Sequence, residues 1–153
     1  MMAGGMDRIH RDDLDAALDH WRARYPPSAD GTLAPQVAAL AEAVARLACQ
    51  GRHEFDVAHL PDIALNAWLA WYASTPDAPC IAICSTAQGD AVCKGCGRTE
   101  HEVQHWPAMG PFAKRAVWYR ITQEGTAWRF NRYAERAQAA SPVSGRADTG
   151  RAT

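Results

Sequence analysis

Residues 61–73 read PDIALNAWLAWYA, and every residue from Ile63 to Ala73 except Asn66 is apolar. Proline is tolerated in the first turn of a helix, so Pro61 marks the start of a helix through this stretch. A helix that is apolar nearly all round has no face suited to water, and it is normally buried on more than one side. The stretch therefore predicts the central helix of the protein core.

Two further helices are predicted upstream of this central helix. Between residues 9 and 25, apolar side chains recur at helical spacing, and prolines at 26 and 27 end the pattern. A second helix is expected from Pro35 to Gly51, with its apolar side chains on one face. The segment RHEFDVAHL, residues 52–60, is compatible with either a short extended piece or a turn. The first half of the chain therefore predicts a three-helix unit.

The second half of the chain is predicted to hold a cysteine-rich loop and shorter helices. Thr99 and Glu102 form a capping-box pattern, which predicts a short helix over EHEVQHW, residues 100–106. Longer helices are expected over residues 111–123 and 125–139. The fold class is therefore mainly α, with a three-helix unit, a small four-cysteine loop module and short helices after it.

The domain organisation follows from the breaks between these segments. Residues 7–74 are expected to form a helical domain, and STPDAP at 74–79 separates it from the next part of the chain. Residues 78–139 are expected to form a cysteine module with C-terminal helices. The small and polar residues 140–153 are expected to be a disordered tail.

The overall composition excludes several classes of protein. The net charge is −1 and the pI is about 6.6, so the field of the whole molecule gives no reason to expect nonspecific binding to nucleic acid or to an anionic membrane. The opening residues MMAGGMDRIH lack the apolar run of a secretory signal, and no segment approaches the roughly 18 apolar residues of a membrane span. We therefore expect a soluble, cytoplasmic protein with no membrane association.

Four of the five cysteines crowd into one short segment with the spacing C-x3-C-x8-C-x2-C. They are Cys80, Cys84, Cys93 and Cys96. In a reducing cytosol such clustering favours metal ligation over disulfides. A CxxC pair followed by glycine is typical of metal-binding turns, which aim backbone N–H groups at the sulfur atoms. The spacing predicts a four-thiolate site for zinc or an iron–sulfur cluster, and ligand identity alone does not choose between them.

Two other patterns in the sequence suggest catalysis less strongly. HEVQH at 101–105 matches the zinc-protease pattern, but Pro107 ends the helix at once and no histidine follows to supply a third ligand. We interpret the match as chance and expect no enzyme, with His101 and His105 as possible donors near the cysteine site. Cys49 lacks an adjoining histidine and acid to activate it, so we expect a small buried residue rather than a nucleophile.

The segment 112–136 offers a different function, because it holds six basic and only two acidic residues interleaved with aromatics. Basic side chains could contact phosphates while an aromatic stacks on bases. The candidate contacts are Lys114, Arg115, Arg120, Arg129, Arg132 and Trp128. The alternative, which we favour, is that the aromatics belong to the core and the arginines form a solvated face. An exposed Trp128 would favour the binding surface.

Two family resemblances accompany these motifs. Residues 79–121 contain Pro-Cys, then Cys-x-Gly-Cys-x-Arg-Thr from Cys93 to Thr99, then Glu102, Trp106 and Met109, and they resemble domain of unknown function 1289. That family is described as predicted iron–sulfur proteins, so the resemblance implies a cluster. Residues 7–70 more loosely resemble domain of unknown function 3717. Neither resemblance implies a substrate.

The function expected from these observations is that of a small metal-binding accessory or regulatory protein. An iron–sulfur cluster would imply electron transfer or redox sensing. A zinc ion would make the module structural, and a zinc-stapled nucleic-acid-binding module is the alternative. We expect a protein partner, whereas a nucleic-acid partner is possible but not favoured.

Overall fold

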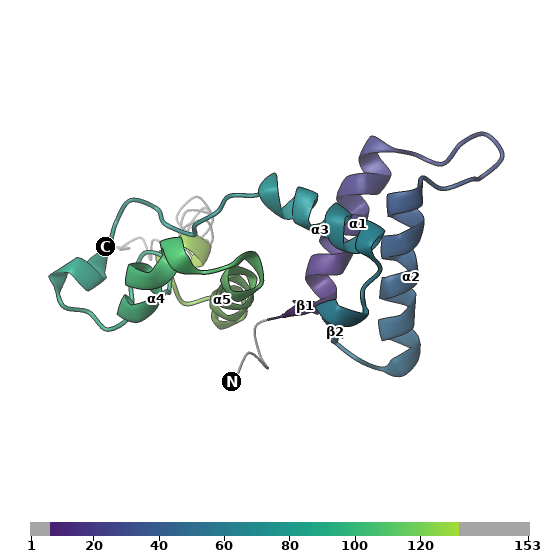
Figure 1. The fold of residues 1–153 in the computed structure, drawn as a ribbon. Helices are drawn as coiled ribbons and strands as arrows, with labels where there is room; N and C mark the ends of the chain where they lie inside the picture. Colours follow the sequence, from purple (N-terminus) through teal and green to yellow (C-terminus); the bar gives the residue numbers. More distant parts are fainter. Residues whose placement is uncertain (1–6, 132–153) are drawn as a thin grey trace, which may run out of the picture.

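The protein is mainly helical, as the sequence predicts, and a computed structural model describes residues 7–131. The five α-helices of the described chain are α1 (Arg11–Arg24), α2 (Pro35–Gln50), α3 (Asp62–Ala73), α4 (Glu100–His105) and α5 (Pro111–Glu124). Three 3-10 turns are η1 (Val57–His59), η2 (Ser85–Gln88) and η3 (Trp106–Ala108), and two strands are β1 (Arg8–His10) and β2 (Glu54–Asp56). Figure 1 shows α1, α2 and α3 gathered at one end of the molecule, with α4, α5 and the cysteine loop at the other.

The core of the N-terminal unit is formed where α1, α2 and α3 pack against one another. Its fully buried side chains include Leu14, Leu40, Leu47 and Trp68. Trp68 of α3 also stacks on Phe112 of α5, with ring centroids 4.9 Å apart. The central position predicted for α3 is therefore confirmed, because its apolar surface faces its own unit on one side and α5 on another.

A short β-ribbon that the sequence did not predict closes this unit. Strands β1 and β2 pair antiparallel, and Ile9 lies opposite Phe55. Both of these side chains are buried while their neighbours along the strands are more exposed, which is the period-2 pattern of a half-buried ribbon. Ile9, at the start of the stretch with helical spacing, therefore belongs to strand β1 and not to the helix. Helix α1 begins only after His10, whose ring accepts a hydrogen bond from the Asp12 N–H at 3.1 Å as a helix cap.

The C-terminal part packs around a second, smaller apolar cluster formed by Trp106, Val117, Trp118 and Ile121. Residues 127–131 then begin a helical turn that lies against the cysteine loop, since the Trp128 N–H donates to the Lys94 carbonyl at 2.9 Å. The predicted helix to residue 139 extends beyond the described residues, and the predicted tail lies entirely outside them.

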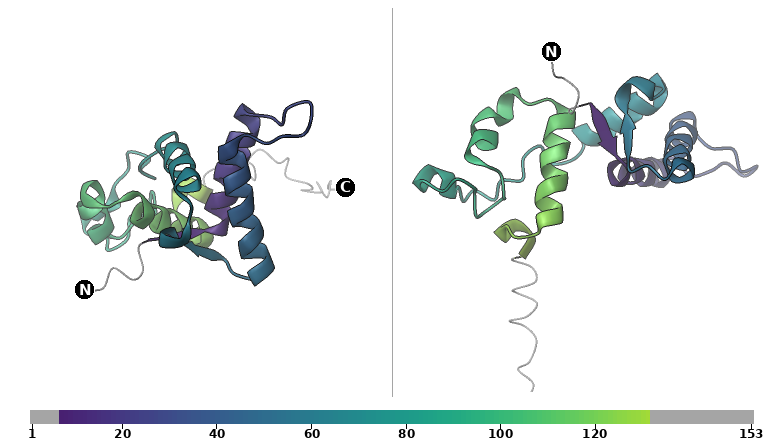
Figure 2. Two further views of the ribbon diagram at one scale, coloured as in Figure 1. Left: turned by 45° about the vertical axis from the view of Figure 1, so that its right-hand side comes forward. Right: turned by 90° about the horizontal axis from the view of Figure 1, so that it is seen from below.

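Helix α5 joins the two parts of the molecule (Figure 2). Its Arg115 forms an ion pair with Asp13 of α1, which is almost fully buried. Its Tyr119 stacks on His10 with ring centroids 4.0 Å apart. The division into domains at 7–74 and 78–139 stays a prediction, but the two parts are in contact through this helix.

Two smaller expectations are also decided by the structure. Cys49 is exposed, so the prediction that it is buried is wrong: the side chain falls on the solvent face of the last turn of α2. Within the described residues, no helix combines the length and apolar character needed to cross a membrane.

Candidate metal centre

The four clustered cysteines come from two segments of one loop, residues 80–84 and 93–96. Cys84, Cys93 and Cys96 lie close together. Cys93 and Cys96 are buried, Cys84 is half-buried and Cys80 is exposed. Across residues 7–131, no group of three or more His, Cys, Asp or Glu side chains is arranged to hold a metal ion as the chain stands. A site closed by all four sulfurs would therefore require the exposed Cys80 to turn inward and the other three sulfurs to draw closer together.

Three of the four sulfur atoms, those of Cys80, Cys84 and Cys96, are contacted by a hydrogen-bonding group two residues further along the chain. The Ala82 N–H donates to Cys80 Sγ at 3.3 Å, and Thr86 Oγ1 lies 3.0 Å from Cys84 Sγ. Arg98 Nε donates to Cys96 Sγ at 3.3 Å, whereas Cys93 Sγ lies 3.4 Å from the Ile83 carbonyl oxygen. A thiolate accepts such bonds well, and donors aimed at sulfur are what a metal-binding turn supplies to spread the negative charge of its ligands.

The turn Cys93–Gly97 is closed by its own backbone. The Gly97 N–H donates to the Cys93 carbonyl and the Cys93 N–H donates to the Arg98 carbonyl, both at 2.8 Å. Gly97 has a φ of 86°, a left-handed conformation that glycine adopts without steric cost. The expectation that CxxCG forms a tight metal-binding turn is consistent with this geometry.

The two cysteine segments meet at Gly95. A Cβ atom added to Gly95 would lie 2.5 Å from the Ile83 carbonyl oxygen, which is a backbone atom that cannot rotate away. The Lys94 N–H also donates to Ser85 Oγ at 2.9 Å, which ties the same segments together. The close approach of Cys84 to Cys93 and Cys96 therefore depends on a position without a side chain.

A buried positive charge lies beside the cysteines. Arg98 is only 6% exposed, its Nε donates to Cys96 Sγ at 3.3 Å, and its guanidinium lies 4.6 Å from the ring centre of Trp106. Among residues 7–131, no carboxylate forms an ion pair with it. A guanidinium stays charged at any pH that proteins experience, so burying it is costly without a compensating negative charge. Four thiolates around a divalent ion would supply that charge.

The two buried thiols differ in acidity. Burial opposes ionisation of Cys93, but backbone hydrogen bonds from Cys96, Ser85 and Gly95, together with the Cys96 side chain, outweigh that cost and lower the pKa of Cys93 to about 7. Burial raises the pKa of Cys96, although Arg98 acts in the opposite direction. In the metal-free chain the Cys93 thiol also donates to the Ile83 carbonyl at 3.4 Å.

The donor set fits a thiolate-bound metal on three grounds. Four soft sulfur ligands lie in one loop, each sulfur has a hydrogen-bonding neighbour, and a buried cation faces the pair that is shielded from water. Sequence reasoning singled out the four cysteines as candidate ligands but missed Ser85, Gly95 and Arg98. The signal available for these three was their position between or directly after the cysteines.

In the HEVQH segment, Glu102 makes contacts that hold helix α4 in place. The Glu102 carboxylate accepts the Thr99 N–H at 2.8 Å in the predicted capping box, and it also forms an ion pair with Arg120 of α5. His101 and His105 are both exposed and stack on each other with ring centroids 4.0 Å apart. The carboxylate that a protease would need as a base is thus occupied by contacts that hold α4. No hydrogen bond in the described chain joins either histidine to a cysteine.

The candidate nucleic-acid contacts do not gather on one free face. Lys114 pairs with Asp77 at 2.8 Å, Arg115 pairs with Asp13, and Arg120 pairs with Glu102 and Glu124. Arg129 donates to the Pro79 carbonyl at 3.1 Å and lies over Trp118. Arg132 lies outside the described residues.

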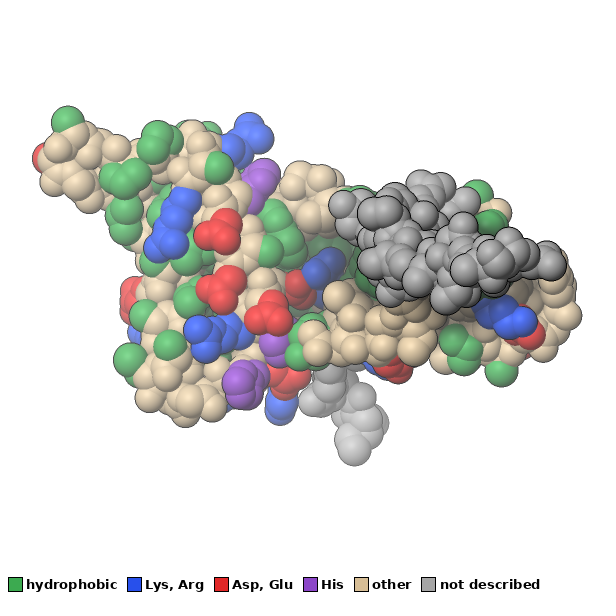
Figure 3. Space-filling model, turned by 180° about the vertical axis from the view of Figure 1, so that it is seen from behind, with side chains coloured by type: hydrophobic (Ala, Val, Ile, Leu, Met, Phe, Trp, Pro, Cys, Tyr) green, Lys and Arg blue, Asp and Glu red, His purple; other side chains and the backbone are tan. Residues whose placement is uncertain are grey.

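The aromatic side chains of the same segment divide between core and surface. Trp118 is buried, whereas Trp128 is 43% exposed and meets the condition stated for a stacking residue. The face drawn in Figure 3 carries Lys and Arg side chains interspersed with Asp and Glu on the N-terminal unit, with no single block of positive charge.

Comparison with known families divides this helical chain into two matched regions. Residues 7–73 match the family model described as protein of unknown function (DUF3717), and residues 78–125 match the model described as protein of unknown function (DUF1289). Both resemblances read from the sequence are therefore confirmed. No curated protein and no solved structure matches the chain. All four clustered cysteines fall in the second region, and neither description specifies an activity.

Proposed function

We propose that this protein is a small cytoplasmic metal-binding protein with an accessory or regulatory role. Cys80, Cys84, Cys93 and Cys96 would hold one metal centre, which would staple the loop between α3 and α4. The observation that carries the proposal is the hydrogen-bonding group found two residues further along the chain at Cys80, Cys84 and Cys96. Turns that place polar groups against sulfur at three positions of one loop have no role in packing an apolar core.

The centre is either a zinc ion or an iron–sulfur cluster, and both have thiolate ligands that such donors stabilise. A zinc ion would supply structural stability only. A cluster would supply one-electron redox chemistry, and hydrogen bonds to its sulfur ligands would tune the potential. The partner in either case is proposed to be a protein, because the basic side chains of the described chain are largely satisfied within the molecule.

The test is metal analysis with a visible absorption spectrum on full-length protein purified without oxygen. About one zinc per chain without colour identifies a structural site, and iron with matching acid-labile sulfide identifies a cluster. Replacing Cys93 and Cys96 together by serine should abolish stoichiometric metal. The matched control is the His101→Ala, His105→Ala double variant, which should keep its metal. Unchanged metal in the cysteine variant, or loss only in the histidine variant, would refute the proposed ligand set.

A further inference from the structure

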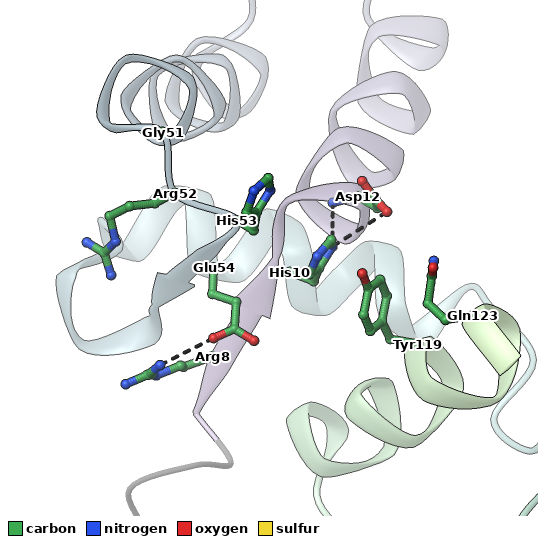
Figure 4. Close-up of a pocket in the computed structure, with 9 residues that line it drawn as sticks. All are labelled: Arg8, His10, Asp12, Gly51, Arg52, His53, Glu54, Tyr119 and Gln123. Atoms are coloured by element: carbon green, nitrogen blue, oxygen red, sulfur yellow. Dashed lines mark hydrogen bonds and ion pairs between the residues drawn. The ribbon is translucent and has the colours of Figure 1, made fainter.

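A groove opens where the N-terminal unit meets α5, far in sequence from the cysteines. Its volume is about 720 Å³, within the range of small-molecule sites, and it is open to solvent (Figure 4). The first strand, the loop after α2 and helix α5 all contribute side chains to it, so it exists only because the two matched regions pack together. Neither family description assigns it a role.

Two imidazole rings form a parallel slot in this groove. The rings of His10 and His53 are inclined by only 9° to each other, and their centroids are 6.5 Å apart. Two successive van der Waals contacts of about 3.5 Å need about 7 Å between the outer rings. The observed spacing is slightly shorter than this, so one flat ring fits between the imidazoles when the exposed His53 ring moves outward, and the spacing is too wide for the two rings to touch face to face.

The His10 ring, one wall of the slot, is held in place without a ligand. His10 is covered on one side by Tyr119, and its Nδ1 accepts the Asp12 N–H at 3.1 Å, which fixes the ring orientation and leaves the Nε2 atom protonated in the neutral form. His53 is exposed and makes no side-chain hydrogen bond within residues 7–131. Its backbone carbonyl accepts the Arg11 N–H at 2.8 Å, so the strand end is fixed while the ring can adjust.

Charged side chains of both signs line the groove around the two histidines. Arg52 directly precedes His53 in the chain, and its guanidinium has no hydrogen-bond or ion-pair partner in the described part of the chain, so it can bind an anionic group. Arg8 is paired with Glu54 through one carboxylate oxygen at 3.2 Å, which leaves the other oxygen able to accept a hydrogen bond. A fitting ligand therefore combines a flat ring, an anionic group and N–H donors.

We propose that this groove binds a mononucleotide, with its base between His10 and His53 and its phosphate on Arg52. The flat base matches the slot, the exocyclic amino or ring N–H groups match Glu54 and Asp12, and the phosphate matches the unpaired guanidinium. This site is separate from the proposed metal centre, and the two share only helix α5.

Calorimetric titration of metal-analysed, full-length protein with AMP, GMP, CMP and UMP tests the proposal. Two fragments serve as controls: adenosine carries a base without a phosphate, and ribose 5-phosphate carries a phosphate without a base. We expect at least one nucleotide to bind more tightly than either fragment. Absence of binding by all four nucleotides at millimolar concentration would overturn the proposal, and so would ribose 5-phosphate binding as tightly as the best nucleotide.

Two single variants locate the ligand within the groove. His53→Ala should weaken nucleotide binding by about 5- to 100-fold, the range expected for loss of one stacking partner, and should leave ribose 5-phosphate binding unchanged. Arg52→Gln should weaken nucleotides and ribose 5-phosphate alike. Arg22→Gln, the same substitution at an exposed arginine of α1 outside the groove, should change neither. Nucleotide affinity unchanged in both groove variants would place the ligand elsewhere and overturn the proposal.

Discussion

Gly95, a position without a side chain, lies where residues 80–84 and 93–96 meet. Gly95→Ala would drive a methyl group against the Ile83 carbonyl oxygen and force the two cysteine segments apart. Overpacking of this kind costs about 1–3 kcal/mol, which corresponds to a metal affinity about 5- to 150-fold weaker. Competition with a chelator of known affinity measures the change.

The control for this substitution is Gly110→Ala. Gly110 has nothing within 4 Å of an added Cβ and a φ of −75°, so alanine fits there without strain. Its metal affinity should equal that of the unmodified protein. Equal affinity in both variants would mean that the two segments need not approach each other to bind the metal.

Arg98 supplies a second prediction at the scale of one residue. Arg98→Met removes the charge but keeps much of the side-chain length against Trp106. A hydrogen bond to a charged group is worth about 1.5–3 kcal/mol, so the affinity for metal should fall by about 10- to 150-fold. The metal-free protein should lose little stability or gain some, because a buried unpaired charge has been removed. Chelator competition and urea unfolding of both forms measure the two effects, and a large loss of metal-free stability would contradict this role.

Among the secondary-structure elements, α4 depends most clearly on its first residues. It has only six residues and no buried side chain, so packing does little to hold it. The capping box of Thr99 and Glu102 satisfies backbone groups at its start, and the ion pair from Glu102 to Arg120 attaches it to α5. The histidine pair in HEVQH therefore lies on a helix that is positioned from its N-terminal end.

Thr99→Ala tests the importance of this cap. The substitution should lower the free energy of unfolding by about 0.5–2 kcal/mol, the usual value of a lost N-cap. Thr122→Ala, at an exposed position within α5, is the matched control and should stay within about 0.5 kcal/mol. Urea unfolding of the metal-loaded protein measures both. Equal effects would show that the cap contributes nothing specific.

For the molecule as a whole, the contact between its two parts depends on α5 and on the segment just before the cysteines. The Asp13–Arg115 ion pair is the most buried charge contact across this boundary. Asp77 lies in the connecting segment, where its side chain accepts hydrogen bonds from Lys114 Nζ at 2.8 Å and Trp106 Nε1 at 3.2 Å. These polar contacts orient α5 on the N-terminal unit.

Asp13→Asn should leave the largely buried Arg115 without a charge partner. We expect the free energy of unfolding to fall by about 2–3 kcal/mol, as for other unpaired buried charges. Asp15→Asn is a matched control on the same helix, since Asp15 forms only an exposed pair with Arg11 at 3.7 Å. That control should change stability by less than about 0.5 kcal/mol. Similar losses in both variants would mean that burial of the Asp13 pair is unimportant.

Asp77 makes the contact between the two parts of the molecule sensitive to acid. The hydrogen bond from Lys114, followed by that from Trp106, lowers the pKa of Asp77 below its ordinary value of 3.8 despite the opposing effect of burial. A carboxyl with a lowered pKa in the folded state stabilises the protein above pH 3.8, and that contribution disappears as the pH falls through the folded-state value. The contribution is small because Asp77 is largely exposed.

Unfolding of metal-free protein between neutral pH and about pH 2 measures this effect. Asp77→Asn should be less stable than the unmodified chain at neutral pH, and the difference should shrink toward zero in acid. A difference that stays constant with pH would show that the Asp77 charge does not contribute.

By itself the sequence determined the helices, the capping box and the four cysteines, because each depends on residues near one another in the chain. Periodicity locates α2 and α3, and the C-x3-C-x8-C-x2-C spacing predicts the proposed metal ligands. The β-ribbon was missed because Ile9 and Phe55 pair across more than forty positions of the sequence, and three-residue strands carry no clear pattern alone. The tertiary structure alone decided that Gly95 fits against Ile83, that Arg98 is buried beside Cys96, and that His10, His53 and Tyr119 meet in one groove. These contacts join distant segments, so only the packing of α5 and the loop brings their atoms together.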